Sequence, residues 1–265
     1  MLTFLYILAG LYVLLCLLFY FGQHYFFFRP EILPGYFKYE YTFPFTEHTF
    51  EMPDGGRINA IHFTVPNTRG VVYYLKGNSR SIKGWGKFAR DFLGKGYDFF
   101  MMDYRGFGKS RGKRSERRLY ADALHVFDWL TERYSPDDIV IYGRSFGSGI
   151  AACVASQRQA RLLILDAPYY SFHWQIRRFA GWLPLRWLLK YKIPTHQFVR
   201  SASCPVRIIH GDRDYIISYR QGVMLRDAAP DKVELVTIRG GRHNNLTDFS
   251  QYHRELYRIL EEAAA

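Results

Sequence analysis

The stretch that decides the fold is Ile139-Val140-Ile141-Tyr142-Gly143-Arg144-Ser145-Phe146-Gly147. Its first four residues are an apolar run typical of a buried strand, and the small residues after it, Ser148 to Ser156, favour a helix. A serine on a tight strand-to-helix turn has a strained backbone, so glycines two residues before and after it prevent clashes. The stretch predicts a nucleophile elbow that exposes the Ser145 hydroxyl, with the Phe146 amide pointing into the same space.

Around this stretch, strand-like and helix-like segments alternate. A hairpin is predicted first, with strands at 49–52 and 57–65 joined by the turn sequence Pro53-Asp54-Gly55-Gly56. The remaining strands are expected at 71–75, 97–102, 139–142, 162–165, 206–210 and 233–238, and helices at 85–93, 116–134, 145–156 and 249–262. Such alternation indicates an α/β fold with a mostly parallel central sheet and helices on both of its faces.

The first 28 residues differ from the rest because they contain no Asp, Glu, Lys or Arg. The apolar run Leu2 to Phe21 is long enough to cross about 30 Å of hydrocarbon as a helix. We therefore predict a transmembrane anchor at 1–28, a connector at 29–48 and a globular domain at 49–265. A cleaved signal peptide is the competing interpretation, but the segment has no basic start, its apolar run is too long and no Ala-x-Ala site follows.

The chain is basic, with 36 Lys and Arg against 24 Asp and Glu and a formal charge of +12. Nucleic-acid binding is disfavoured because no recognisable module is present and the basic residues are scattered. Attraction to anionic lipid headgroups explains the charge beside a membrane anchor, and an ordinary basic surface is the alternative. Arg29 and Lys38, which follow the anchor, favour a single-pass protein with its domain on the cytoplasmic side. The three cysteines have no disulfide or metal-ligand pattern: Cys16, Cys153 and Cys204.

One interval breaks the alternation. About 40 residues separate Leu165 from Val206, more than a simple crossover needs, and they are rich in aromatic side chains. We predict a cap at 168–203, inserted after the sixth strand, whose apolar residues line a pocket for an acyl or aryl group. Its basic residues would face phosphate headgroups: Arg177, Arg178, Arg186, Lys190 and Lys192. The alternative is that the aromatic residues only pack the cap on the domain.

A serine nucleophile needs a base, normally a histidine held by a carboxylate. His243 is the strongest of the nine histidines because it lies in the polar loop Gly240-Gly241-Arg242-His243-Asn244-Asn245, after the last strand. Active-site residues of such sheets gather at the carboxyl ends of the strands. His210, which ends a strand before a glycine, is expected to be buried and structural.

Three aspartates follow strands and are candidates for the carboxylate. Asp214, just beyond the strand at 206–210, is favoured by its placement. Asp212 is expected to shape the turn beside Gly211, and Asp166 follows the strand at 162–165.

The tetrahedral intermediate of acyl transfer also needs two amide donors for its oxyanion. Phe146 N–H would supply one of them. The second is expected from the loop Lys76-Gly77-Asn78-Ser79, after the strand at 71–75, with Asn78 N–H as the donor. This scheme requires no metal and no cofactor.

With these motifs in view, the sequence from about Thr49 onward resembles the α/β-hydrolase superfamily. The resemblance rests on Lys76-Gly77-Asn78, the stretch from Asp103 to Ser110, the elbow, the stretch from His210 to Asp214, and His243, in that order. The chain order Ser145, Asp214, His243 is that of the family. The sequence is most similar to small membrane-anchored serine hydrolases, depalmitoylase-like and serine-aminopeptidase-like.

The chain departs from the family pattern at Lys76, where relatives usually have histidine. The oxyanion donor in this loop is a backbone amide, so it does not depend on the side chain at position 76. We expect the Lys76 cation to strengthen oxyanion binding or to favour an anionic substrate. The resemblance also implies structural roles for Asp103 and Arg105, in tying a loop near the floor of the site.

These observations predict a membrane-anchored serine hydrolase that cleaves an ester or thioester of a small-molecule or lipid-like acyl substrate. Two alternatives remain. A serine aminopeptidase would need an acidic group in the cap, but the stretch Tyr169 to Ser203 has none. A non-catalytic membrane scaffold that kept the fold is the other.

Overall fold

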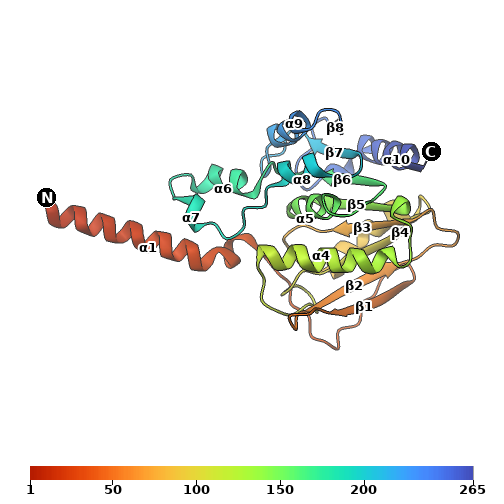
Figure 1. The fold of residues 1–265 in the computed structure, drawn as a ribbon, viewed down its shortest axis with the longest axis horizontal. Coiled ribbons are helices and arrows are strands. Elements are labelled where there is room, and N and C mark those ends of the chain that lie inside the picture. The colour runs from red at the N-terminus through yellow and green to blue at the C-terminus, as the bar shows by residue number, and fades with distance from the viewer. Residues whose placement is uncertain (265) are drawn as a thin grey trace.

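Eight strands form one sheet in the computed structural model, which describes residues 1–264 (Figure 1). The strand order is β1-β2-β4-β3-β5-β6-β7-β8. β1 and β2 form an antiparallel hairpin, β2 pairs antiparallel with β4, and every other pair is parallel. The bounds are β1 Phe45–Glu51, β2 Arg57–Phe63, β3 Val71–Leu75, β4 Asp98–Met102, β5 Ile139–Arg144, β6 Leu162–Asp166, β7 Val206–Gly211 and β8 Val233–Ile238. The prediction of a mostly parallel sheet is confirmed.

Helices cover both faces of this sheet, as expected. α4 (Glu116–Thr131), α5 (Phe146–Ala155), α8 (Thr195–Ser201) and α9 (Tyr219–Ala228) pack on one face. α2 (Ile82–Trp85), α3 (Arg90–Leu93) and α10 (Ser250–Ala264) pack on the other. Because side chains alternate along a strand, Val71, Tyr73 and Leu75 of β3 enter the first core, whereas Val72 and Tyr74 enter the second.

Some boundaries differ from the sequence-based expectation. The helix expected at 85–93 is divided by the 3₁₀ turn Gly86–Ala89 into the short helices α2 and α3. Glycines have low helix propensity, and the aromatic ring of Tyr41 lies so close to Gly86 that a side chain there would clash with it. The helix expected to reach Tyr134 ends at Thr131. Tyr134 lies beyond the helix end, and its hydroxyl donates to Asp98.

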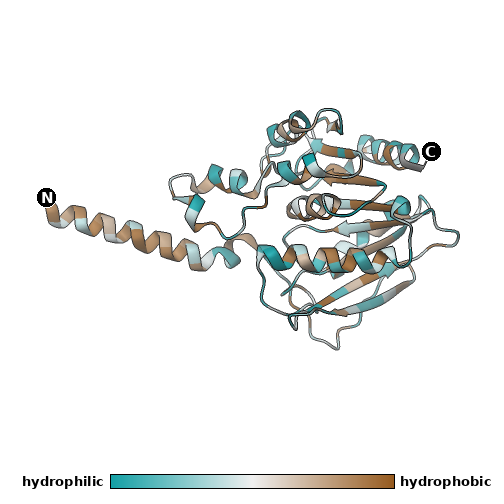
Figure 2. Cartoon of the chain, in the orientation of Figure 1, coloured by the Kyte–Doolittle hydropathy of each residue, from teal (hydrophilic) through white to brown (hydrophobic). Residues whose placement is uncertain are grey.

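The first helix, α1 (Leu2–Phe27), projects from the domain (Figure 1) and is apolar around its whole circumference (Figure 2). The helix has 26 residues and contains an 18-residue stretch with a mean hydropathy of 2.5, so it is long and apolar enough to cross a membrane. An N-terminal signal sequence passes the same test of length and composition. Gln23 and Phe27, in its last turns, are buried against the domain.

Between β6 and β7 lie α6 (Phe172–Ala180), α7 (Leu185–Leu188) and α8. The first two helices extend beyond the domain on the side where α1 leaves it (Figure 1). The Gln23 side chain joins them to α1, because its Nε2 donates to Leu188 O at 2.8 Å and its Oε1 accepts from Lys190 N at 2.9 Å. α8, the last part of the range predicted as a cap, packs on α5 through the buried Val199.

Candidate active site

Ser145 occupies the turn between β5 and α5, with φ 52° and ψ −119°. This positive φ is a conformation that side-chain-bearing residues rarely adopt. A Cβ on Gly143 would lie 2.5 Å from the Ala151 methyl group, and one on Gly147 would overlap the carbonyl oxygens of Leu75 and Lys76. The two glycines therefore let the turn approach its neighbours, as the elbow prediction requires.

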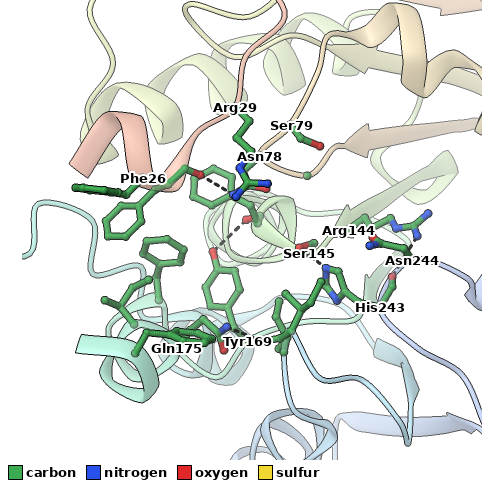
Figure 3. Close-up of a pocket in the computed structure, with 18 of the residues that line it drawn as sticks. Phe26, Arg29, Asn78, Ser79, Arg144, Ser145, Tyr169, Gln175, His243 and Asn244 are labelled. Atoms are coloured by element: carbon green, nitrogen blue, oxygen red, sulfur yellow. Dashed lines mark hydrogen bonds between the residues drawn. The ribbon is translucent and has the colours of Figure 1, made fainter. Parts of the chain in front are cut away.

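His243 and Asp214 reach Ser145 from two other strand ends. His243 Nε2 lies 2.9 Å from Ser145 Oγ, and His243 Nδ1 lies 2.7 Å from Asp214 Oδ2. Because an ionised carboxylate only accepts hydrogen bonds, Nδ1–H donates to Asp214, and in the neutral imidazole Nε2 then has the free lone pair. The structure thus brings together the three side chains that the sequence singled out, and Figure 3 shows two of them, His243 beside Ser145.

The Asp214 carboxylate is buried and well supplied with donors. Its Oδ1 accepts from the amides of Ile216 and Ile217 at 2.8 and 2.9 Å. Burial by itself would raise the pKa of Asp214, but hydrogen bonds from His210 and His243 outweigh burial and lower that pKa well below its usual range. Asp214 is therefore a carboxylate beside His243 at neutral pH.

The other two candidate carboxylates lie elsewhere. Asp212 accepts from the Gly240 amide at 2.7 Å, so it ties its turn to the loop that carries His243. Asp166 is buried behind the sheet end, where it accepts from the Tyr142 hydroxyl at 2.7 Å and lies 3.7 Å from Arg144. The placement argument that favoured Asp214 over these two agrees with the geometry.

The two predicted oxyanion donors flank Ser145. Phe146 is the first residue of α5, so its N–H has no carbonyl partner within the helix. The loop after β3 lies against the elbow, because a Cβ on Gly77 would come within 3.8 Å of Ser145 Cβ. Asn78 is held there by α1 and its extension: its side-chain amide donates to Phe27 O, and its carbonyl accepts from Arg29 N at 3.0 Å.

The expectation for Lys76 was wrong. Its side chain is fully buried and does not line the pocket at Ser145: Nζ lies 3.4 Å from Asp103 Oδ1 and 3.9 Å from the centre of the Phe107 ring. Burial lowers the pKa of Lys76 and raises that of Asp103. The direction of a side chain is decided by packing, and here a buried carboxylate and aromatic rings surround the cation. Lys76 therefore has a structural role and does not face the oxyanion or the substrate.

Asp103 and Arg105 are structural, as the resemblance implied. Asp103 accepts from the Ile82 amide at 3.0 Å, which fixes the start of α2. Arg105 pairs with Asp122 and Asp54, each at 2.7 Å, and so joins its own loop to α4 and to the β1–β2 turn.

A cavity of about 690 Å³ opens above Ser145 and is mostly apolar on one side. The expectation that the cap's aromatic residues line a pocket holds for Tyr169 and Phe172. It fails for Trp182 and Trp187, which are exposed. The lining comprises Phe19, Phe26, Phe27, Arg29, Gly77, Asn78, Ser79, Trp85, Arg144, Ser145, Phe146, Tyr169, Phe172, Gln175, Ile176, Phe179, Ala180, Ile216, Ile217, His243 and Asn244.

Two features of this site were not predicted from the sequence. Phe19, Phe26 and Phe27 of α1 form part of the pocket wall, although the sequence predicted the segment 1–28 only as a membrane anchor. His210, correctly expected to be buried, also lies 3.3 Å from Asp214 Oδ2. The spacing of four residues between His210 and Asp214 was the only local signal for this second contact.

Comparisons with known proteins agree with this architecture. A family model described as "Serine aminopeptidase, S33" matches residues 66–203. An uncharacterized protein of Mycobacterium tuberculosis is 31% identical over 222 residues, which cover 81% of this chain and 78% of that protein. The alpha/beta hydrolase domain-containing protein 17C of Xenopus tropicalis is 29% identical over 201 residues, 74% of this chain, and the match spans 63% of the relative's length.

Among solved structures, an esterase of Pyrococcus furiosus superposes with a TM-score of 0.71 at 18% identity, covering 89% of this chain and all of the esterase. At that identity the likeness establishes the fold. Since the family model matches more than half of the chain, the protein belongs to the α/β-hydrolase superfamily and to the family described as serine aminopeptidase, S33.

Proposed function

We propose that the protein is a membrane-anchored serine hydrolase that cleaves an ester or thioester of an acyl, lipid-like substrate. The observation that carries this proposal is the hydrogen-bonded line from Asp214 through His243 to Ser145, with distances of 2.7 and 2.9 Å. A serine hydroxyl, a base within hydrogen-bonding distance and a carboxylate that orients the base are the parts needed for nucleophilic acyl transfer.

In the proposed mechanism, Ser145 Oγ attacks the substrate carbonyl while His243 Nε2 takes the hydroxyl proton. His243 then gives that proton to the leaving alcohol or thiol, and an acyl group remains on Ser145. Asp214 holds the Nδ1–H tautomer and stabilises the imidazolium that forms. A water molecule, activated by His243, releases the acyl group as a carboxylic acid.

The oxyanion of each tetrahedral intermediate would lie between the amides of Phe146 and Asn78. Removing one donor from such a pair typically costs about 3 kcal/mol of transition-state stabilisation. The α5 amino terminus adds a favourable partial positive charge at the same place. The Asn78 hydrogen bonds to Phe27 and Arg29 would keep the second donor in position.

The composition of the pocket favours an acyl substrate over a peptide amino terminus. A substrate ammonium group would need an acidic partner, and the pocket lining within residues 1–264 contains no Asp or Glu but does contain Arg29 and Arg144. The apolar side of the cavity instead suits a hydrocarbon chain. The family description therefore does not by itself argue for aminopeptidase activity in this chain.

The proposed anchor is α1. Its apolar surface is exposed along nearly its whole length, which is costly in water and favourable in lipid. Arg29 and Lys38 support a domain on the cytoplasmic side. Mass spectrometry of the protein extracted from membranes tests retention of α1: a peptide that starts within residues 1–5 is expected, and a mature chain that starts after Phe27 would contradict the anchor.

A fluorophosphonate probe tests the nucleophile in the full-length protein. We expect the wild type to be labelled and Ser145→Ala to lose labelling completely. Ser156→Ala, at the other end of α5 where the hydroxyl donates to Cys153 O, is the matched control and should be labelled like the wild type. Labelling that persists in Ser145→Ala would contradict the proposal.

A turnover profile across acyl esters, thioesters and aminoacyl amides then identifies the reaction. Hydrolysis of long-chain esters or thioesters is expected. Preferred cleavage of aminoacyl amides would favour the peptidase alternative. Probe labelling without turnover of any of these substrates would favour the scaffold alternative.

A further inference from the structure

The pocket at Ser145 has walls from two elements that are far apart in the sequence, α1 and α6. Phe19, Phe26 and Phe27 come from α1, and Phe172, Ile176 and Phe179 come from α6. The Phe27 and Phe172 rings meet edge to face, with centroids 5.0 Å apart. Figure 3 shows this aromatic wall on the side of Ser145 where α1 and α6 face each other.

The segment 172–191 follows α1 along much of its length. Near the domain, the Tyr191 hydroxyl is within 3.2 Å of His24 Nδ1, and Gln23 binds Leu188 and Lys190. Farther out, the Tyr12 hydroxyl donates to Trp182 O at 3.1 Å. Tyr12 and His24 are separated by about 18 Å along a helix that rises about 1.5 Å per residue. If α1 is in a bilayer, the connection between α6 and α7 lies beside it within the membrane.

The outer surface of this segment has the composition of a membrane interface. Three large aromatic side chains are mostly exposed, Phe179 at 65%, Trp182 at 60% and Trp187 at 77%. Three exposed arginines accompany them: Arg177, Arg178 and Arg186. Aromatic rings prefer the boundary between headgroups and acyl chains, and long arginine side chains can reach from there to lipid phosphates.

The two ends of the pocket differ in polarity. In Figure 3, Phe26 lies on the α1 side of Ser145, whereas Arg144, His243 and Asn244 lie on the opposite side. An acyl chain bound along the aromatic wall would put its carbonyl at Ser145 and its leaving group toward the polar end. This orientation needs the chain to enter from the α1 side.

We infer that α1 and the segment 172–191 insert into the membrane as one unit, and that the acyl chain reaches Ser145 directly from the bilayer, between Phe19 and Phe179. The inference rests on the proposed function for the anchor and for the acyl substrate. It adds the source of the substrate, a lipid or lipidated molecule held in the same leaflet. A hydrophobic substrate would then reach the site without exposing its hydrocarbon chain to water.

Fluorescence quenching tests the insertion without requiring catalysis. The chain has five tryptophans, and each can be retained alone, with the others changed to Phe. The full-length protein is reconstituted in phosphatidylcholine–phosphatidylglycerol vesicles whose acyl chains carry bromine. We expect bromine to quench Trp182 and Trp187, but not Trp129, which packs on Phe50 in the domain and serves as the matched control. Equal quenching of all three, or no quenching of Trp182 and Trp187, would overturn the inference.

An activity measurement tests the entry route. Trp187 is outside the pocket, so Trp187→Glu should leave hydrolysis of a water-soluble short-chain ester unchanged. It should lower kcat/KM for a long-chain ester embedded in the vesicles by about tenfold, because a charge replaces an apolar group at the interface. Equal rates of variant and wild type on the embedded ester would overturn the route. If bromine quenches Trp182 and Trp187 but the protein hydrolyses no ester, the insertion into the membrane is supported and the proposed function is refuted.

Discussion

The buried imidazole of His210 lies 3.3 Å from Oδ2 of Asp214, the same oxygen that accepts the hydrogen bond from His243. His210 Nε2 is also 2.9 Å from the Ile217 carbonyl, and a carbonyl oxygen only accepts, so the proton of His210 is on Nε2. That N–H points between the carbonyl and the carboxylate. Two histidines therefore hold one aspartate, the first from the core side and the second from the pocket side.

His210→Phe tests this arrangement. The change keeps a ring of similar size but removes the N–H of His210 that faces Asp214 and the Ile217 carbonyl. The loss of this donor should destabilise the fold by about 1–3 kcal/mol. We expect kcat to fall by about tenfold, measured with a short-chain ester, since Asp214 would orient His243 less well. His125→Phe, at an exposed histidine of α4, is the control and should be neutral. An unchanged kcat would mean that the Ile216 and Ile217 amides suffice to hold Asp214.

The pKa of Asp214 predicts a pH dependence of stability. Because this pKa is lower in the folded than in the unfolded chain, the folded state binds fewer protons. The stabilisation is therefore fully present well above the unfolded value of about 4, and it is lost progressively as the pH falls below that value toward the lower pKa of the folded state. Urea unfolding of wild type and Asp214→Asn should show a difference in unfolding free energy at pH 7 that narrows as the pH falls from about 5 to about 2. A difference that stays constant over this range would contradict the prediction.

Gly147→Ala is expected to destabilise the elbow. The added methyl group would overlap the carbonyl oxygens of Leu75 and Lys76, which belong to the end of the central strand β3 and the start of the loop after it, so this backbone cannot move away cheaply. Overpacking of this kind costs about 1–3 kcal/mol or more. The midpoint of thermal unfolding measures the effect. Gly35→Ala, where nothing lies within 4 Å of the new atom, should leave the midpoint nearly unchanged.

Lys76→Met should destabilise the protein strongly, because it leaves Asp103 buried without its cation. Breaking one partner of a buried ion pair costs about 3–5 kcal/mol. The double variant Lys76→Met/Asp103→Asn should recover part of that loss, and chemical denaturation of the four proteins gives the coupling energy. Losses that simply add would show that the two side chains act independently.

Phe179→Ser should change the preference for chain length. Phe179 lines the pocket and is 65% exposed, so its removal shortens the apolar wall with little effect on the core. Losing contact with two methylene groups would lower kcat/KM for a long-chain ester by about tenfold relative to a short-chain ester. Tyr36→Ser, at an exposed aromatic residue outside the pocket, should keep the wild-type ratio.

The alternation of strands and helices, the hairpin turn and the elbow glycines could be predicted because they depend on local rules. Apolar runs mark the strands, and the space around Gly143 and Gly147 is restricted by their own chain neighbours and an adjacent strand. Candidate residues at strand ends could also be named, since parallel strands bring their carboxyl ends to one edge of the sheet. The close packing of the Tyr41 ring on Gly86 could not be predicted, because it brings the connector against a helix far from it in the sequence.

By itself, the sequence determined the fold class, the apolar N-terminal helix and the short set of residues from which a site could be built. Only the tertiary structure decided that His243 meets Asp214 and not Asp166, that Lys76 points into the core, and that Phe19, Phe26 and Phe27 line the pocket. The reason is physical: hydrophobic periodicity and turn chemistry act over a few residues, whereas side-chain direction and pairing are decided by whichever distant segments pack against them.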